Sequence, residues 1–328
     1  MKKIKSKNVC PDIEYSFLPI LTDSSMTERK IPLISAKSPN PGPVLWLTGC
    51  AHGDEVAGMV IIHEVFQKVC ANKLLKGSVH ALPLMNPTGF EMATRNITIS
   101  NEDLNRSFPG NKSGSLGERI ANTIFSTIMK TNPSVVLDIH NDWLKSIPYA
   151  IIDPKPANII KEIYDKTKLF ARATGLIVVE DTEDYENSLS CSLIKHNIPA
   201  LTLELGESLI INEKNVEYGV KCISNILTQL EMIKPVNPLF IHQPAKNFTG
   251  KKLFFSQKPL SSCSGVIRFL TKPGDAVEKD QTIAGIYNSF GKLEETLISP
   301  HNGIVLGHSD HAVTFPGSPV MAFGVSAK

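Results

Sequence analysis

The sequence predicts an α/β fold in which a largely parallel sheet is flanked by helices, followed by a small all-β domain. Two observations indicate this architecture. Between residues 43 and 232, short apolar runs alternate with segments of helical periodicity, as expected for a sheet buried on both faces. Beyond about residue 248 the helical periods stop, and short strands between Gly, Pro and Asn turns remain. We therefore divide the chain into domains at residues 1–245 and 246–328.

Each element follows from its own pattern. Residues 1–40 are expected to form an extended lead-in that ends at a turn cluster, and 86–114 a polar loop. The expected strands are short runs rich in leucine or β-branched residues: 43–49, 79–84, 135–139, 149–152, 176–179 and 200–205. The expected helices carry apolar residues at helical spacing: 56–71, 116–129, 156–174, 187–196 and 212–232. Ser115 is the expected N-cap of the second helix, because Glu118 follows three residues later.

Composition excludes several classes of partner. The 328 residues are 42% apolar and 20% charged, which is ordinary for a globular protein. The formal net charge of +2 gives no electrostatic footprint for nucleic acid. No apolar stretch approaches the roughly 18 residues that span a bilayer, and acidic residues soon follow the basic N-terminus, so neither a membrane partner nor a secretory signal is expected. Six cysteines without a CxxC pair indicate reduced thiols in a cytoplasmic enzyme.

Polar side chains follow three of the expected strands, at the point where each strand ends. His52 and Glu55 come directly after the first strand, His140 ends the strand that begins at 135, and Glu204 lies near the end of the strand over 200–205. In open α/β sheets ligands bind beyond the strand ends. A carboxylate in an apolar run such as that around Glu204 is costly unless it is paired or protonated. We therefore predict a metal site with a free carboxylate nearby, which is typical of a hydrolase.

The types and spacing of these residues suit a catalytic zinc ion, which usually has three protein ligands and one open position. His52 and Glu55 form a short-spaced pair, and His140 would be the distant third ligand. Asp138 lies on the same strand face as His140 and is positioned to orient its imidazole. Each residue alone also has an ordinary structural interpretation, as a cap, a hydrogen-bonded histidine or a strand-end charge. Cys50 is expected to be a small buried residue rather than a ligand.

Four motifs resemble those of succinylglutamate desuccinylase and aspartoacylase, which are related to zinc carboxypeptidases. They lie in order over about 43–235, at 52–55, 101–110, 138–140 and 202–206. The resemblance implies a mixed, largely parallel sheet and one zinc ion per subunit, bound by His52, Glu55 and His140. It also implies further roles: Glu204 as general base and proton shuttle, Arg95 polarising the scissile carbonyl, and Asn105 with Arg106 gripping a substrate carboxylate.

One departure concerns the substrate. Aspartoacylase carries a further substrate-binding arginine about ten residues before the general base, whereas residues 188–196 contain none. Either Lys195 substitutes, or the substrate lacks a second carboxylate. The resemblance therefore implies a small N-acyl amino acid-like substrate, with the acyl group and the amine left open.

The C-terminal motifs at 272–279, 283–286 and 298–305 resemble a lipoyl or biotinyl-type barrel-sandwich. Lys292 lies near the turn that would carry a cofactor, but it lacks the flanking residues that modifying enzymes require, so we expect an ordinary turn lysine. His301, His308 and His311 are expected to be loop residues rather than a second metal site. Covering the active-site mouth and mediating homo-oligomer contacts both remain open as roles for this domain.

Together these features predict a zinc-dependent amidohydrolase that removes an acyl group from a small N-acyl amino acid or related amine. Two alternatives remain. A carboxypeptidase acting on short peptides would use the same site. A non-catalytic metal-binding or carrier protein would have the same fold with a degenerate metal site. The intact ligand, base and arginine positions argue against this alternative.

Overall fold

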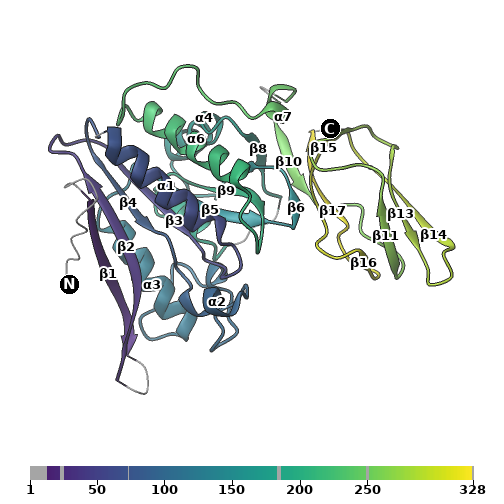
Figure 1. The fold of residues 1–328 in the computed structure, drawn as a ribbon, viewed down its shortest axis with the longest axis horizontal. Coiled ribbons are helices and arrows are strands. Elements are labelled where there is room, and N and C mark those ends of the chain that lie inside the picture. Colours follow the sequence, from purple (N-terminus) through teal and green to yellow (C-terminus); the bar gives the residue numbers. More distant parts are fainter. Residues whose placement is uncertain (1–12, 23–25, 73, 183–185, 249–250, 327–328) are drawn as a thin grey trace.

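A computed structural model describes residues 13–22, 26–72, 74–182, 186–248 and 251–326. Figure 1 shows a larger unit, built of a sheet and helices, and a smaller unit of strands at the C-terminal end. The core of the larger sheet runs, in spatial order, β1 (Ile13–Thr22), β2 (Glu28–Lys37), β4 (Ser78–Leu82), β3 (Val44–Gly49), β5 (Val135–Asp142), β9 (Ala200–Glu207), β7 (Tyr149–Ile152) and β8 (Ile177–Glu180).

The pairing within this sheet is mixed. Strands β4, β3, β5 and β9 are mutually parallel in that order, and β7 pairs in parallel with β8. Antiparallel pairs join β1 to β2, β2 to β4 and β7 to β9. The predicted mixed, largely parallel α/β fold is therefore confirmed.

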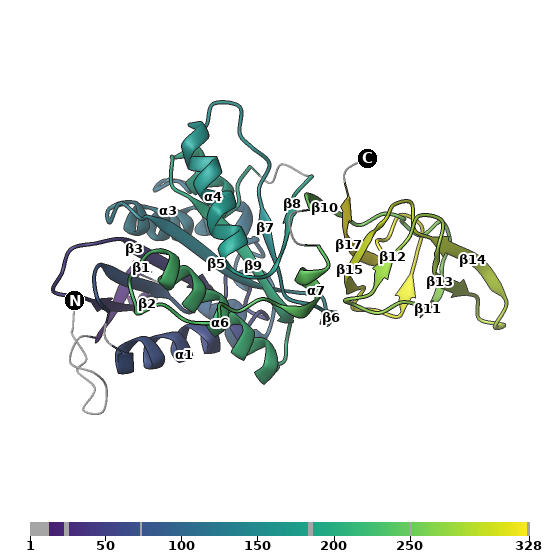
Figure 2. The same ribbon diagram turned by 90° about the horizontal axis from the view of Figure 1, so that it is seen from above.

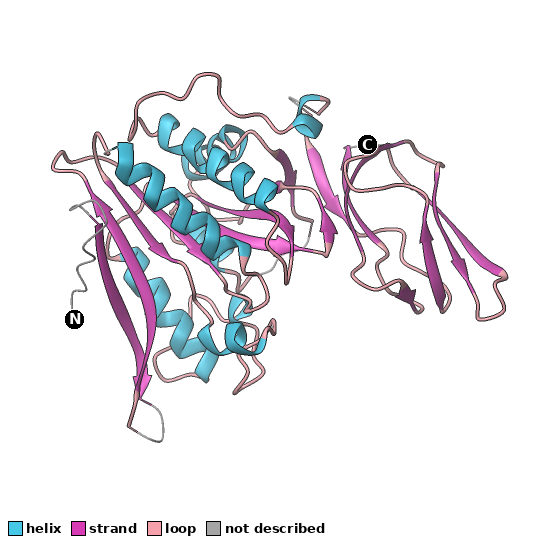
Figure 3. Ribbon diagram, in the orientation of Figure 1, coloured by secondary structure: helices cyan, strands magenta, loops and turns pink. Residues whose placement is uncertain are grey.

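Helices cover both faces of the sheet, as the cyan ribbons on either side of the strands in Figure 3 show. One face packs against α1 (Ala57–Asn72), α4 (Lys161–Ala173) and α6 (Glu213–Gln229), and the other against α3 (Leu116–Met129) and α5 (Leu189–Lys195). Because side chains alternate along a strand, Leu137 and Leu203 enter the first core, whereas Val136 enters the second. His140 and Glu204 therefore face the side of α3 and α5.

The segment expected to be an extended lead-in is in fact a pair of sheet strands. The strands β1 (Ile13–Thr22) and β2 (Glu28–Lys37) pair antiparallel at the sheet edge, while residues 1–12 and 23–25 of that prediction lie outside the described residues. The polar loop over 86–114 also contains the short helix α2 (Pro87–Met92) and a 3-10 turn at Leu104–Arg106. The helix expected over 156–174 begins later, at Lys161.

The start of α3 confirms the predicted capping. The Ser115 hydroxyl accepts a hydrogen bond from the Glu118 backbone at 3.3 Å, and the Glu118 carboxylate accepts one from the Ser115 backbone at 2.8 Å. This reciprocal pair satisfies two backbone donors that a helix start otherwise leaves open. Ile120, Ile124 and Ile128, four residues apart, form the buried face of the helix.

The C-terminal strands form a second, antiparallel unit. One sheet runs β14 (Leu293–Ile298), β13 (Thr282–Tyr287), β11 (Gly265–Phe269) and β16 (Val313–Thr314). The other strands are β10 (Leu253–Ser256), β17 (Met321–Ser326), β15 (Gly303–His308) and β12 (Ala276–Val277), and they continue the large sheet because β10 pairs in parallel with β8. The two-residue strand β6 (Lys145–Ser146) also pairs with β15. The small helix α7 (Gln243–Lys246) precedes β10, and the boundary at 245/246 stays a prediction.

Figure 2, seen from above, places the C-terminal strands beyond β8 and β10, on one side of the larger unit. Within the described ranges, no helix is both long enough and apolar enough to cross a membrane.

Candidate active site

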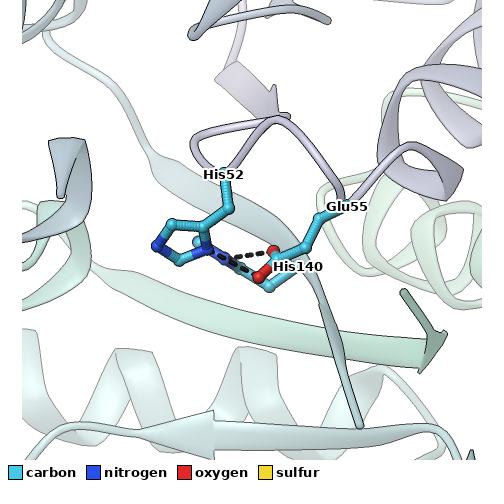
Figure 4. Close-up of side chains that lie close together, drawn as sticks. All are labelled: His52, Glu55 and His140. Carbon is cyan, nitrogen blue, oxygen red and sulfur yellow. Dashed lines mark hydrogen bonds and ion pairs between the residues drawn. The ribbon is translucent and has the colours of Figure 1, made fainter. Parts of the chain in front are cut away.

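Three side chains from two neighbouring strand ends point toward one another (Figure 4). His52 and Glu55 lie in the turn between β3 and α1, and His140 lies near the end of β5, which is the parallel neighbour of β3. The turn is tight: a Cβ at Gly53 would lie 1.9 Å from the Gly89 backbone, so only glycine fits there. Parallel pairing and this turn therefore bring the three side chains to one place.

The geometry of the three side chains suits a shared metal ion. The His52 and His140 Nδ1 atoms lie 2.6 Å and 2.7 Å from the two carboxylate oxygens of Glu55. All three residues are buried, and their donor atoms lie within 4.8 Å of one another. Among the described residues no second group of this kind is found. The three residues predicted as metal ligands are thus brought together.

Two carboxylates hold the far side of the imidazole rings. His140 Nε2 donates to Asp138 Oδ2 at 2.9 Å, and Asp138 Oδ1 accepts a bond from the Thr48 hydroxyl at 2.6 Å. His52 Nε2 donates to Asp103 Oδ1 at 3.1 Å. With Nε2 protonated on both rings, both Nδ1 atoms present lone pairs to the same point.

Electrostatics favour a cation at this point. Burial favours neutral Glu55, but the two imidazoles outweigh it and hold the pKa of Glu55 well below its usual range. Burial also opposes charge on the rings, but the Glu55 carboxylate raises the pKa of His52, and Asp138 with Glu55 raises that of His140. The site therefore attracts two positive charges, which a divalent ion can supply in place of two ring protons. The residues present fit a metal ion with nitrogen and oxygen ligands.

Glu204 lies beside His140, because the two residues are directly paired in the β5–β9 register. Its Oε2 atom is buried and has no hydrogen-bond partner among the described residues. Burial and the nearby Asp142 carboxylate raise the pKa of Glu204 well above its usual value. A buried carboxyl oxygen without a partner is costly in a purely structural role, and raised pKa values of this kind cluster at functional sites.

A second, half-buried acid, Asp142, lies near Glu204. Tyr149, which pairs with Glu204 across β7 and β9, donates its phenol hydrogen to Asp142. Burial raises the pKa of Asp142 to about 7 despite that bond. Neither residue was predicted, because the two come together only when β7 turns back antiparallel to β9.

Arg95 extends over the group from the segment after α2. Its guanidinium donates from Nε and Nη2 to Asp103 Oδ2, at 3.2 Å and 3.0 Å, and Nη1 lies 3.7 Å from Glu55 Oε1. The side chain is 49% exposed, so its other face is open to solvent. Asp103 therefore holds both Arg95 and His52, a role that the sequence did not predict.

Asn105 and Arg106 lie on the 3-10 turn next to the site. The Asn105 side-chain oxygen accepts a bond from Leu189 N at 2.9 Å, and its amide nitrogen lies 3.5 Å from His140 Nε2. Arg106 is exposed, donates to the Asn105 carbonyl at 2.8 Å and lines a cavity of about 410 Å³ together with Asp103. The structure thus places Asn105 beside His140, whereas Arg106 lies in the cavity next to Asp103.

Other predicted features fall outside the group. The Cys50 thiol donates to the Glu55 carbonyl, and burial raises the pKa of Cys50 to about 12, so it remains a thiol, as expected. Lys195 lies at the far end of α5, 3.6 Å from Glu186. Lys292 lies in the turn between β13 and β14. The loop assignment for His308 is wrong: it is buried in β15 and stacks on Phe269, since the strand pairs with β17.

Comparisons with known proteins identify similar proteins of one enzyme family. The catalytic-domain model of the succinylglutamate desuccinylase/aspartoacylase family matches residues 41–230. N-alpha-acetyl-L-2,4-diaminobutyric acid deacetylase from Halomonas elongata is 26% identical over 296 residues, covering 84% of this chain and 80% of that protein.

Solved structures share the fold. A succinylglutamate desuccinylase/aspartoacylase from Rhodobacter sphaeroides is 19% identical, with a TM-score of 0.80 over 100% of both chains. A metallo-carboxypeptidase from Burkholderia cenocepacia is 16% identical, with a TM-score of 0.56 over 68% of this chain and 65% of its own. The fold is therefore also that of zinc carboxypeptidase-like proteins. Because the family model covers more than half of the sequence, the chain belongs to the succinylglutamate desuccinylase/aspartoacylase family, whose members are deacylases acting on linear amides.

Proposed function

We propose that this protein is a zinc-dependent amidohydrolase that removes the acyl group from a small N-acyl amino acid or related amine. The observation that carries the proposal is the buried group of His52, Glu55 and His140 beside the Glu204 carboxyl, whose Oε2 atom has no hydrogen-bond partner among the described residues. Amide hydrolysis requires both an electrophile and a base.

His52, Glu55 and His140 would hold one zinc ion per subunit, through the Nδ1 atoms and the Glu55 carboxylate. Two imidazoles and one carboxylate are a ligand set typical of catalytic zinc, and they leave a position open. When bound, zinc supplies Lewis acidity toward water and toward the amide carbonyl. Asp138 and Asp103 keep the two rings in the required tautomer and orientation.

Glu204 would act as general base and then as general acid. Its raised pKa means that the carboxyl group holds a proton readily, so it can accept one from the attacking water and return it to the leaving amine. Because Glu204 Oε2 has no partner among the described residues, proton transfer does not require breaking a structural hydrogen bond of that atom.

Arg95 would stabilise the oxyanion that develops on the carbonyl oxygen. Asp103 fixes the guanidinium by two bonds, while the exposed half of the side chain faces outward. A positioned cation beside a developing negative charge lowers the barrier without reorganising at the moment of reaction. Asn105 and Arg106 would bind the substrate carboxylate, for which a planar guanidinium is well suited.

The substrate class follows from the relative and from the missing arginine. The Halomonas protein is named for deacetylating N-alpha-acetyl-L-2,4-diaminobutyric acid, which supports an N-acyl amino acid. No arginine occurs in residues 188–196, and Lys195 lies away from the group, so a second substrate carboxylate is not required. The reduced, buried thiols of Cys50 and Cys222 agree with the proposed cytoplasmic location, and a homo-oligomer remains open.

Replacing the proposed base tests the mechanism. Glu204→Gln keeps the shape of the side chain but cannot take up a proton, so we expect kcat to fall by about 10²–10⁴-fold. The zinc content of the variant, measured by inductively coupled plasma mass spectrometry, should equal that of the wild type. Glu207→Gln is the matched control on the same strand, because the Glu207 carboxylate bonds Asn212 and Asn215 instead of facing the group. Wild-type turnover by Glu204→Gln would falsify the assignment.

The carboxypeptidase alternative is tested with the same enzyme. A panel of N-acetyl and N-succinyl amino acids is compared with dipeptides of the same residues. We expect kcat/KM to be higher for the acyl amino acids, and higher values for dipeptides would favour the peptidase.

A further inference from the structure

A second cavity lies away from the metal group, where the two units of the chain meet. It measures about 520 Å³ and is bounded by α4, β8 and the segment that leads into β10. In Figure 2, β8 and β10 lie side by side at this junction, in agreement with their parallel pairing. The volume falls within the range of about 300–1,000 Å³ that is usual for small-molecule sites.

The walls of this cavity carry an unusual concentration of positive charge. Its charged lining residues are Lys168, Arg172, Glu180, Lys251 and Lys252, which leave a net charge of +3 at neutral pH. The whole chain carries a formal charge of only +2. Converging cations repel one another, so the cavity provides a favourable site for an anion.

The single carboxylate organises two of these cations without neutralising the rest. Glu180 Oε1 lies 3.2 Å from Lys168 Nζ, and Glu180 Oε2 lies 2.9 Å from Lys252 Nζ. Arg172 is exposed on the last turn of α4, where its guanidinium can bind a carboxylate through two parallel bonds. Glu180 thus holds two ammonium groups in place at the rim.

The remainder of the lining is apolar. Leu176, Ile177 and Leu253 are buried in the floor, and Val178 and Phe248 are half-buried beside them. A purely inorganic anion would leave this surface in contact with water, whereas a ligand with an apolar body would cover it. The charge at the rim and the apolar floor therefore complement the two ends of an amphipathic anion.

From this arrangement we infer that the cavity between α4, β8 and β10 is a second binding site, specific for a small amphipathic carboxylate. The carboxylate lies against Arg172 and Lys251, since Glu180 already pairs with Lys168 and Lys252, and the apolar body lies on Leu176, Val178 and Phe248. The site is separate from the group of His52, Glu55 and His140, so it does not depend on the proposed hydrolysis.

Calorimetric titration of the full-length, metal-loaded protein with decanoate tests the inference. We expect saturable binding of one decanoate per chain at this site. Decanol has the same body without the charge, and inorganic phosphate has charge without the body, so each should bind at least tenfold more weakly. Acetate reports any binding of a carboxylate to the metal, and it should not compete with decanoate.

Variants locate the site. The double variant Arg172→Gln/Lys251→Gln should weaken decanoate binding at least tenfold. Lys161→Gln is the matched control, because Lys161 lies on the same helix but pairs with Asp165 and does not line the cavity. All these side chains are at the surface, so the variants should unfold at the wild-type temperature. Unchanged decanoate binding by the double variant, equal affinity for decanol, or the lack of saturable binding would each overturn the inference.

Discussion

Asp138 offers a specific test of how the metal group is built. It is 1% exposed and uses both carboxylate oxygens, one for His140 Nε2 and one for the Thr48 hydroxyl. Asp138→Asn keeps the volume but leaves one acceptor oxygen and no charge. If the asparagine oxygen faces Thr48, the His140 imidazole loses its acceptor. If the oxygen faces His140, the Thr48 hydroxyl loses its acceptor and the imidazole still loses a charged partner. In either case His140 becomes a weaker ligand.

The size of this effect follows from the bond at 2.9 Å between His140 Nε2 and Asp138 Oδ2. Removing such a carboxylate from a metal-binding histidine usually costs about 10–100-fold in metal affinity, which corresponds to about 1.4–2.7 kcal/mol. We expect the zinc dissociation constant of Asp138→Asn to rise by that factor. Competition with a chromophoric zinc chelator measures it.

Thr48→Val is the matched control. It removes the other hydrogen bond of the same carboxylate and leaves the bond to His140 in place. Zinc affinity should stay near the wild-type value, although thermal stability should fall because a buried acceptor loses its donor. The reasoning is refuted if folded Asp138→Asn binds zinc as tightly as the wild type, or if both variants lose affinity equally.

Two further predictions concern Arg95 and His80, a buried histidine of β4. Arg95→Lys cannot make both bonds to Asp103, so kcat/KM should fall about 10²–10³-fold with zinc content unchanged, and wild-type kinetics would remove Arg95 from the mechanism. Burial lowers the pKa of His80 to about 4, so the stability from its neutral ring is present above pH 6.5 and is lost as the pH falls toward 4. Between pH 7 and pH 4, the free energy of unfolding measured with urea should fall by up to about 3 kcal/mol less in His80→Gln than in the wild type. Equal falls in the two proteins would contradict this.

The sequence located the metal group because the fold rule behind it is simple. Parallel neighbours β3 and β5 end at the same edge, so His52, Glu55 and His140 had to come close once the strands were identified. The same rule placed Glu204 beside His140, since β9 is the next parallel strand. Alternation along these strands then fixed the face on which the side chains lie.

Other features depend on contacts that no local pattern records. The strands β1 and β2 were missed because Pro19 and Pro32 interrupt their patterns, and proline disfavours a strand interior. Both prolines are tolerated: Pro19 lies on the edge strand next to a register shift, and at Pro32 β2 pairs only with β1, because its pairing with β4 begins at Ile34.

The role of Asp103 was missed for a related reason. A carboxylate in a polar loop has many possible partners, and the nearest in sequence was Arg106. Asp103 instead contacts Arg95, eight residues earlier, and His52, which is 51 residues away. Only the path of the loop over the sheet edge decides between these partners.

Metal analysis of the purified protein bears on the proposed function before any substrate is known. We expect one zinc ion per chain in the wild type, full retention in Glu204→Gln, and loss of zinc in His52→Gln and His140→Gln at equal protein concentration. Zinc that stays bound when both histidines are replaced, or a folded wild-type chain that binds none at micromolar free zinc, would show that these side chains do not form the metal site.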